Sequence, residues 1–579
     1  MPVRTACVAL ALCYATALLG AANASPRLSN LAVSAENLAF TAGTPQTSQP
    51  IVIDLSTADV VTKLAAQVCV GLFNRDGASS RGAYALIEAV DADWLADIEG
   101  IRDPTLHSVA DFLELCLHGP NPVARGFLRY NYTAQKELVP NIITVAAVLD
   151  AVPLEDGHPA ITGANILFDA NVVFAGFKPL DATSYTFNQY ANITTGISKM
   201  NPGYSKSKTH PFNPPLTRDA NSGLVDYIVK ERLFNFFLWN GCIPGTEEYV
   251  LQKRMVSDPS TAWKKPLDVM GYDDSWPIAG DLFEAETDCN KEHNMGQIAS
   301  NGVPNLSFFS RKAKVGSPML QNIAPAPGYN KSKTYIGIVV GDGDNIAFIR
   351  TSRRRWFMDR AARCAANQGC FPLLWTISPA LLHLAPDWLR WYYNNSYASK
   401  HDYFVLPPSG DLYAYPAMMP EDMQANFMSN TERDCVLLNT SASVTWEWFD
   451  TWSTAIKHVY PKYAKQNTVR GLFAVNVPYM FPVLNFGPKE HYKILGGKVV
   501  LFKPREWRGP ACTPKSACPT AHELAAEING YPKGTVSHIY VTSDGGGNLG
   551  DIYDMVAALD EHVEVSNHEM LVQAALQRG

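Results

Sequence analysis

The sequence predicts an α/β protein in which a (β/α) barrel-like domain follows a smaller α/β domain. Two observations support this fold class. In residues 251–579, roughly eight apolar segments rich in β-branched residues alternate with helical segments. The run at residues 335–340 has no polar alternation, which is typical of a strand buried on both faces. A doubly wound sheet is the alternative, because the sequence does not show whether the sheet closes.

The length and charge of the chain limit the class of protein. With 579 residues, the chain is long enough for more than one domain. A net charge of −7 is mild for this size and argues against nucleic acid or anionic membranes as partners. We therefore expect a globular protein whose partners are neither nucleic acids nor anionic membranes.

Residues 1–24 have the composition of a secretory signal. Arg4 supplies a positive charge, residues 6–22 form a nearly unbroken apolar run, and residues 22–24 match the A-x-A cleavage pattern. No basic stop-transfer cluster follows, and no later stretch approaches the length of a spanning helix. The sequence thus predicts a secreted or secretory-pathway protein with no integral membrane segment.

The cysteines and glycosylation triplets agree with that compartment. Cys364 and Cys370, and likewise Cys512 and Cys518, lie close in sequence with Gly or Pro between them, which predicts two local disulfides. Buried free thiols are the alternative. The N-x-S/T triplets that could carry glycans begin at Asn131, Asn192, Asn305, Asn330, Asn394 and Asn439.

Residues 26–250 read as one N-terminal α/β accessory domain. Predicted strands cover residues 51–54, 126–130, 166–168 and 172–174. Predicted helices cover residues 57–73, 91–101, 107–116, 142–149 and 225–239. This region shows no catalytic constellation.

Residues 251–579 read as the catalytic-type domain. Predicted strands cover residues 267–272, 303–309, 335–340, 373–377, 403–406, 435–438, 471–477, 498–502 and 538–542. Predicted helices cover residues 357–366, 386–393, 420–428, 446–458, 521–528 and 552–562.

Carboxylates and aromatic rings follow several of these predicted strands. In a parallel barrel or sheet, residues after the strands meet at one rim, where ligands bind. Cleavage of glycosidic bonds needs acids for proton transfer, and flat rings suit sugar faces. The candidate catalytic residues are Asp342, Asp344, Asp544, Asp411 and Glu447. The candidate substrate-binding residues are Asn345, Tyr413, Tyr415, Trp375 and Asn548. For each carboxylate taken singly, capping of a strand end is an equally good interpretation.

Three other motifs do not predict a site. The glycines at 545–550 match a dinucleotide-binding pattern, yet Asp544 would repel a phosphate and too few residues follow for a nucleotide domain. The stretch from Asp342 resembles the start of a calcium loop, but Ile346 replaces a ligand and no Glu closes it. No G-x-S-x-G elbow exists for a serine triad. We therefore predict no cofactor and no bound metal.

The stretch Gly410-Asp-Leu-Tyr-Ala-Tyr-Pro416 resembles the signature of the GxGYxYP putative glycoside hydrolase family, with Leu412 in place of a glycine. The strand-ending Asp342-Gly-Asp-Asn345 is similar to a motif of the same family. The order of three upstream segments, at residues 238–245, 269–272 and 305–307, is also similar. The resemblance implies an N-terminal domain, a C-terminal catalytic-type domain and a carbohydrate substrate.

These observations together predict a secreted carbohydrate-active hydrolase that cleaves glycosidic bonds with paired carboxylates. Two alternatives stay open. A metal-dependent, polysaccharide deacetylase-like enzyme would use Asp342 and Asp344 with His383 or His401, although neither histidine has ligand spacing to a second one. A glycan-binding protein on a degenerate enzyme fold would use the aromatic rings without catalysis.

Overall fold

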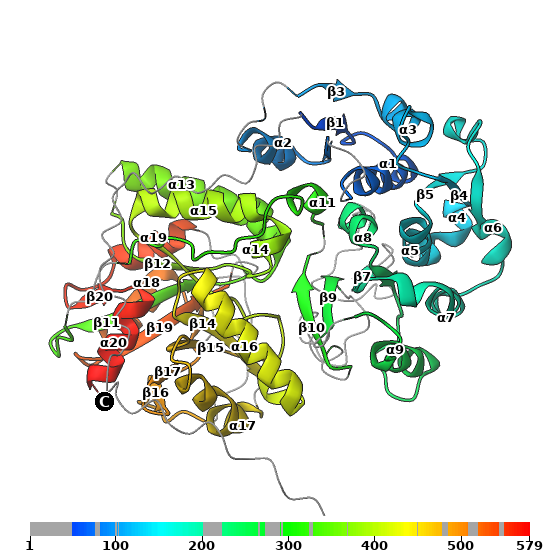
Figure 1. Cartoon of the computed structure of the whole chain (residues 1–579). Helices are drawn as coiled ribbons and strands as arrows, with labels where there is room; N and C mark the ends of the chain where they lie inside the picture. The colour runs from blue at the N-terminus through cyan, green and yellow to red at the C-terminus, as the bar shows by residue number, and fades with distance from the viewer. Residues whose placement is uncertain are drawn as a thin grey trace, which may run out of the picture. The chain divides into compact units, whose positions relative to one another are not determined.

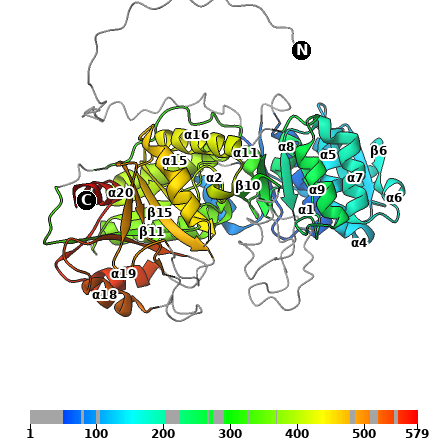
Figure 2. The same ribbon diagram turned by 90° about the horizontal axis from the view of Figure 1, so that it is seen from below.

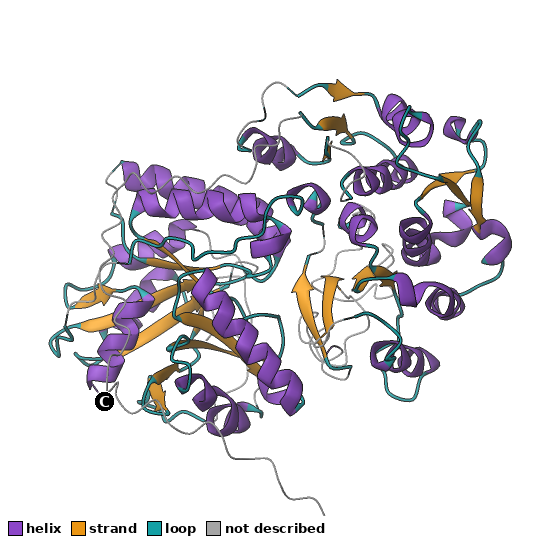
Figure 3. Cartoon of the chain, viewed as in Figure 1, coloured by secondary structure: helices purple, strands orange, loops and turns teal. Residues whose placement is uncertain are grey.

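Short parallel strands alternate with helices throughout the computed structural model, as the apolar runs predict (Figures 1 and 3). The structure describes residues 49–578 apart from a set of internal segments. These segments are residues 76–80, 99–100, 102–103, 201–222, 264–266, 273–289, 291–292, 301, 324–327, 367–368, 449, 478–484, 508–518 and 543–548. Residues 46–579 form one compact unit, and the predicted boundary near residue 250 stays a prediction.

Two three-stranded parallel sheets lie in the first part of the chain. One has the order β2-β1-β3 and the other β5-β4-β6. Their strands are β1 (Ile51–Asp54), β2 (Ala83–Leu86), β3 (Leu106–His107), β4 (Gly126–Tyr130), β5 (Ala151–Glu155) and β6 (Ile166–Asp169). The helices between them include α1 (Val60–Phe73), α2 (Ala89–Ala96), α3 (Val109–His118), α4 (Tyr132–Gln135), α5 (Val139–Leu149), α6 (Ala170–Val173) and α7 (Pro179–Tyr190).

A third parallel sheet has the order β10-β9-β7-β8. Its strands are β7 (Ile197–Met200), β8 (Phe234–Phe236), β9 (Leu267–Tyr272) and β10 (Met295–Ala299). The helices along this stretch are α8 (Val225–Glu231), α9 (Glu247–Ser257) and α11 (Leu306–Phe309). Tyr413 pairs with Gln297 of β10, which brings the loop after residue 406 against this sheet.

The last part of the chain holds two further sheets. One has the order β13-β12-β11-β19-β18 with β20 beside β11, and the other has the order β14-β15-β17-β16. Their strands are β11 (Thr334–Val340), β12 (Leu373–Thr376), β13 (Asp402–Val405), β14 (Ala442–Trp448), β15 (Gly471–Val477), β16 (Tyr492–Leu495), β17 (Val499–Phe502), β18 (Glu506–Trp507), β19 (Val536–Val541) and β20 (Val563–Val565). The pairing of β16 with β17 is antiparallel, and the other pairings in these sheets are parallel.

Helices connect these strands. They are α12 (Ile346–Phe348), α13 (Arg354–Ala365), α14 (Leu381–Leu384), α15 (Pro386–Ser399), α16 (Glu421–Leu437), α17 (Trp452–Thr454), α18 (Ala521–Asn529), α19 (Leu549–Ala557) and α20 (His568–Arg578). Figure 1 shows α13 and α15 side by side, and Figure 2 shows α18 beside α19; each pair is in contact. None of the helices in the described ranges is long and apolar enough to cross a membrane.

The two C-terminal sheets share one core, although their hydrogen-bonded ladders do not close. An isolated bridge between Leu406 and Ser443 joins the end of β13 to β14. Alternate residues from both sheets, such as Val339, Val405 and Val475, lie in one buried cluster. The structure thus establishes a mixed α/β fold with mostly parallel sheets, and the barrel itself is not confirmed.

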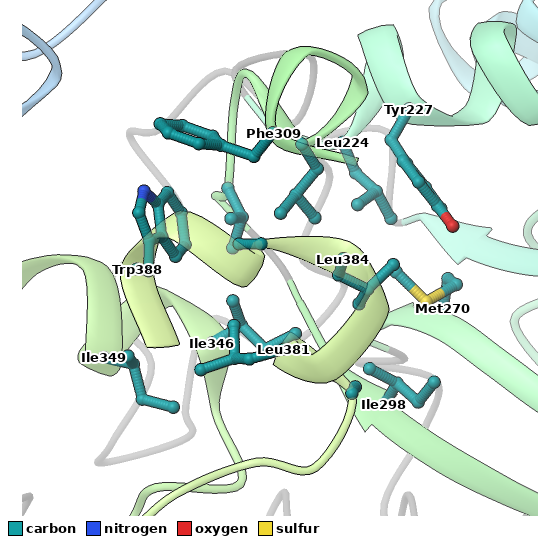
Figure 4. Packing of buried hydrophobic residues seen from close by; sticks show 14 of the residues in the cluster. Leu224, Tyr227, Met270, Ile298, Phe309, Ile346, Ile349, Leu381, Leu384 and Trp388 are labelled. Atoms are coloured by element: carbon teal, nitrogen blue, oxygen red, sulfur yellow. The ribbon is translucent and has the colours of Figure 1, made fainter. Parts of the chain in front are cut away.

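A second apolar cluster connects the β9–β10 sheet to the region that follows β11. Leu381 and Leu384 of α14 lie near Ile346 and Ile298, as Figure 4 shows. Each of these side chains is at most 7% exposed. Burial of one such side chain contributes about 1.5–3 kcal/mol. Through Ile346, this packing holds the segment after Asp344 against α14.

Several of the predicted elements are wrong in whole or in part. The predicted helix 446–458 begins within strand β14, and its helical part starts only at Trp452. Residues 303–309 and 172–174 are helical rather than extended, in α11 and α6. Residues 435–438 end the long helix α16, and the strand lies instead at β14. The predicted helix 225–239 stops at Glu231, because Arg232 adopts a left-handed conformation with φ 53° before β8 begins.

The predicted disulfide between Cys364 and Cys370 is confirmed, with their Cα atoms 5.2 Å apart. A second disulfide joins Cys69 to Cys116, and Cys435 is a buried free thiol. The pair Cys512–Cys518 lies outside the described residues. Asn305 is 1% exposed, so the triplet at this position leaves no room for a glycan, whereas the other five triplets stay predictions.

Candidate functional site

The end of β11 is built around two glycines. A Cβ atom on Gly341 would lie 2.3 Å from the hydroxyl oxygen of Tyr540, and one on Gly343 would lie 1.8 Å from the carbonyl oxygen of Thr376. Such distances are far below van der Waals contact, so only glycine fits at either position. Between them, Asp342 has a left-handed φ of 59°, which Asp tolerates better than most residues. The two glycines thus let the chain turn tightly where β11 meets its neighbours.

Arg353 and Tyr540 lie beside the two carboxylates of this turn. An Nη of Arg353 lies 3.8 Å from a carboxylate oxygen of Asp342, and Arg353 also donates to the carbonyl of Gly341. The Tyr540 hydroxyl accepts a long hydrogen bond from the Asp342 backbone N–H at 3.4 Å. The side chain of Asp342 is 21% exposed and that of Arg353 is 4% exposed. The buried guanidinium of Arg353 therefore lies next to the partly exposed carboxylate of Asp342.

The electrostatics link Asp344 to the same cluster. Burial lowers the pKa of Arg353, and the charges of Asp342 and Asp344 oppose that shift. Burial raises the pKa of Tyr540 well above its usual value, and the same two carboxylates add to the rise. These four side chains thus form one interacting group, which we call the β11 cluster: Asp342, Asp344, Arg353 and Tyr540.

Asn345 and Thr376 support the turn from either side. The side-chain Oδ1 of Asn345 accepts from the Ala347 N–H at 2.9 Å, and thereby caps helix α12. The Thr376 hydroxyl accepts from the Gly343 N–H and donates to the Val340 carbonyl, both at 2.8 Å. Asn345 is 7% exposed. Its observed role is therefore a helix cap, and its predicted substrate contact stays a prediction.

Asp411 lies in the loop after β13 and faces helix α16. It accepts a hydrogen bond from Asn430 at 2.8 Å, and its backbone N–H donates to the Thr431 hydroxyl at 3.1 Å. Burial raises the pKa of Asp411 well above its usual value, and the neighbouring charge of Asp434 raises it further. An Asp411 carboxyl in this setting favours its protonated form.

Glu447 is completely buried at the end of β14. One of its oxygens accepts from the Ala417 N–H at 3.0 Å and from the Tyr460 hydroxyl at 2.9 Å. The other oxygen accepts from the Thr451 hydroxyl at 3.1 Å. Burial raises the pKa of Glu447 to about 8, so that it carries a proton at neutral pH. Glu447 and Asp411 thus have partners different from those of the β11 cluster.

The predicted aromatic residues stand close to one another around Trp446. The rings of Tyr413 and Tyr415 lie 5.2 and 6.3 Å from that of Trp446, and the Tyr415 ring is nearly parallel to it. Tyr415 and Met418 line a small pocket that is partly open to solvent. Both tyrosines are at most 5% exposed, so little of either ring is open to a ligand in this conformation.

Trp375 faces the protein interior rather than the solvent. It is 2% exposed, and its indole N–H donates to a carboxylate oxygen of Asp402 at 2.7 Å. The ring packs against Phe357 at 5.3 Å, and the Arg353 guanidinium lies 5.8 Å from its centre. The ring is thus buried among protein neighbours in this structure, and its predicted sugar-stacking role stays a prediction.

Sequence reasoning missed Arg353, Tyr540 and Thr376. Arg353 belongs to a basic run at residues 350–355 that carries no motif, and Tyr540 stands within an apolar strand. Gly341 gives one sequence signal for Tyr540. A glycine within a buried strand often marks a place where a large side chain packs against the backbone, and Tyr540 occupies that place. The predicted Asp544 and Asn548 lie outside the described residues.

The described residues do not include a ligand set of the kind that metal ions need in proteins. No group of three His, Cys, Asp or Glu side chains is arranged there to hold an ion. His383 is partly buried on α14, where this burial lowers its pKa to about 4. The neutral imidazole that results has no described carboxylate among the charges that act on it.

Comparison with known structures supports the fold. A crystal structure of a putative hydrolase from Bacteroides thetaiotaomicron VPI-5482 is 18% identical, with a TM-score of 0.71 over 92% of this chain and 95% of that chain. A 4-alpha-glucanotransferase from Thermococcus litoralis is 12% identical over 42% of this chain and 40% of that chain, and its TM-score of 0.30 carries no argument. No curated protein matches the chain. The family model described as the GxGYxYP putative glycoside hydrolase C-terminal domain matches residues 332–491, which contain three of the four β11-cluster residues.

Proposed function

We propose that this protein is a carbohydrate-active hydrolase that cleaves glycosidic bonds with paired carboxylates. The observation that carries the proposal is the placement of Asp342 and Asp344 at the carboxyl end of β11, beside Arg353 and Tyr540. Ligands of parallel α/β folds bind at this end of the strands. The family whose model matches residues 332–491 supports a carbohydrate as the substrate.

The proposed roles follow from the charge of each group. Cleavage needs one carboxylate as base or nucleophile and one protonated acid near the leaving oxygen. Asp342 and Asp344 take the first role, since the guanidinium of Arg353 balances negative charge there. Asp411 or Glu447 takes the second, because burial raises the pKa of Asp411 well above its usual value and that of Glu447 to about 8. Asp544 is proposed at the same rim, with Asn345, Asn548 and the two tyrosines as substrate contacts.

This assignment of roles requires the two C-terminal sheets to close. We propose that they form a (β/α) barrel, preceded by the accessory domain of residues 26–250. The shared buried cluster of alternate residues supports this, because a barrel interior is filled in that way. In a barrel, Asp342 after β11 and Glu447 at the end of β14 share one rim.

Turnover of a glycan tests the function. We expect the purified protein to release products from at least one member of a broad panel of oligosaccharides and polysaccharides. Replacing Asp344 with Asn should lower turnover by about 10²–10⁴-fold, because the isosteric amide cannot act as base or nucleophile. The matched control is Asp359→Asn, which removes an exposed carboxylate from α13 and should leave turnover unchanged.

The outcomes separate this proposal from its alternatives. Full turnover by the Asp344→Asn variant contradicts the assignment of Asp344. Release of acetate, with loss of activity in the presence of a chelator, would establish the deacetylase-like alternative instead. Glycan binding without any product would establish a binding protein on an enzyme fold.

We also propose that the protein is exported after removal of residues 1–24. The apolar run and A-x-A pattern support this, and disulfides such as Cys69–Cys116 are typical of exported proteins. Secreted protein should begin at Ser25 when its N-terminus is determined by mass spectrometry. Cell-retained protein that still begins at Met1 would contradict export.

A further inference from the structure

A π-helical turn lies a few residues after Asp344 in the chain and contains Arg353 of the β11 cluster. After α12, the chain passes through the π turn η6 (Ile349–Arg353) and enters α13. In such a turn, the backbone N–H bonds to the carbonyl five residues earlier rather than four. Single π turns inside helices are rare and are frequent at functional sites. This turn carries Arg350 and Arg353, which have different partners.

Arg353 faces the β11 cluster. It donates to the Gly341 carbonyl, lies 3.8 Å from Asp342, and has its guanidinium 5.1 Å from the ring centre of Trp356. Its side chain is 4% exposed. Its position therefore depends on the exact rotation of the helix that carries it.

Arg350 faces residues near α2. It donates to Asp91 at 2.7 Å and to Glu88 at 2.8 Å. Arg350 and Asp91 are each 1% exposed, whereas Glu88 is half exposed. The Asp91 carboxylate also accepts from the backbone N–H groups of Ile87 and Glu88, which fixes its direction. Asp91 is thus a rigid, buried partner for the π turn.

Side-chain donors also hold the backbone of the turn. The Arg350 carbonyl accepts from the indole N–H of Trp94 at 2.9 Å, and the Ile349 carbonyl accepts from the Tyr392 hydroxyl at 2.5 Å. The Trp94 ring stacks on Trp388 with centroids 5.1 Å apart. Because a π turn frees carbonyls from the ordinary helical pattern, such donors select it over a regular helix.

We propose that Asp91 and Trp94 are positioning residues for the β11 cluster: they hold the π turn that keeps Arg353 against Gly341 and Asp342. A turn that relaxed into a regular α-helix would shift the register by one residue, and one residue is about 100° of rotation. Arg353 would then leave the carboxylate. The proposal extends the proposed function, because it makes the accessory part of the chain a determinant of the candidate site.

The accessibility of Arg353 tests the proposal without any substrate. The full-length protein is treated with phenylglyoxal, and modified arginines are quantified by peptide mapping. The test variants are Asp91→Asn, which weakens the anchor of Arg350, and Trp94→Phe, which removes the indole donor but keeps an aromatic ring. The control is Asp97→Asn, because Asp97 binds the next residue, Arg354, at 2.6 Å in a more exposed ion pair.

We expect Arg353 to react at least tenfold faster in both test variants and within twofold of the wild type in Asp97→Asn. Protection of Arg353 in both folded test variants would overturn the proposal, as would equal reactivity in the control. Trp94→Phe alone decides the matter if Asp91→Asn does not fold. Because these rates need no turnover, a failure of the proposed function leaves this test intact.

Turnover adds a second readout once a substrate is known. Both test variants should then lower kcat at least tenfold with KM within threefold, and Asp97→Asn should leave both constants unchanged. A uniform loss of activity in all three variants would show general loosening and would overturn the positioning role.

Discussion

Gly343 lies so close to β12 that no larger residue fits without moving the backbone. A Cβ at this position would meet the Thr376 carbonyl oxygen at 1.8 Å, and its N–H already bonds to the Thr376 hydroxyl. The glycines of this motif are therefore structural requirements, whereas Asp342 and Asp344 supply its two carboxylates. Within this motif, the glycines determine the backbone conformation, and the aspartates provide the charged side chains.

Replacing Gly343 with Ala should destabilise the protein by about 1–3 kcal/mol, the usual cost of overpacking a site that cannot relax freely. Urea unfolding followed by circular dichroism measures this difference. Gly316→Ala is the control, since nothing lies within 4 Å of a Cβ there, and its effect should stay within about 0.5 kcal/mol. Equal stability of the two variants would show that the turn after β11 is looser than the structure indicates.

The elements that sequence predicts best are those with uniform apolar runs. The strand at residues 335–340 and the strand at 471–477 are found where predicted, because continuous burial leaves an unambiguous pattern. The stretch 303–309 is short and apolar as well, but it folds as α11, since Asn305 takes a left-handed φ of 68° and its side chain binds the backbone of Ala85. Local pattern cannot foresee a partner more than two hundred residues away.

In the candidate site, too, some residues can be predicted from local sequence, whereas others depend on distant partners. Asp342 and Asp344 could be found because carboxylates interrupt an apolar strand beside glycines. Arg353 could not, because its place depends on a π turn whose carbonyls bond to Trp94 and Tyr392. The sequence predicts Trp375 as a sugar contact, whereas in the structure its ring is 2% exposed and lies beside Arg353, a burial that the local pattern does not reveal.

At the level of elements, two neighbouring ion pairs of η6 and α13 should differ in energy. Burial raises the pKa of Asp91 in spite of the opposing charge of Arg350, so the pair itself adds little net stability. Removing the charge of Asp91 nevertheless leaves Arg350 buried with only the half-exposed Glu88, and should cost about 3–5 kcal/mol. Asp97→Asn breaks a more exposed pair and should cost at most about 1 kcal/mol. Denaturant unfolding of both variants measures the two costs, and equal values would contradict this ranking.

For the whole molecule, buried titrating groups determine how stability varies with pH. Burial lowers the pKa of His383 to about 4 and that of His538 to about 3, from 6.5. A histidine whose pKa is lowered on folding binds its proton more readily in the unfolded state. The free energy of unfolding therefore rises with pH between the folded pKa and 6.5, and this histidine no longer affects it at higher pH. Glu447 acts in the opposite direction, because its pKa rises from 4.5 to about 8 on folding.

The free energy of unfolding should therefore fall between pH 6.5 and pH 8, where Glu447 is the group of these three that still titrates differently in the two states. A carboxyl with a raised folded pKa loses stability as pH rises from its unfolded to its folded value, at about 1.4 kcal/mol per unit. The expected loss is about 2 kcal/mol, measured by urea unfolding at the two pH values. The Glu447→Gln variant should lose less over the same interval, since its amide keeps acceptors for Ala417 and Tyr460 and does not titrate. An identical slope in both proteins would show that Glu447 is charged in the fold, and would remove it as the proton donor of the proposed reaction.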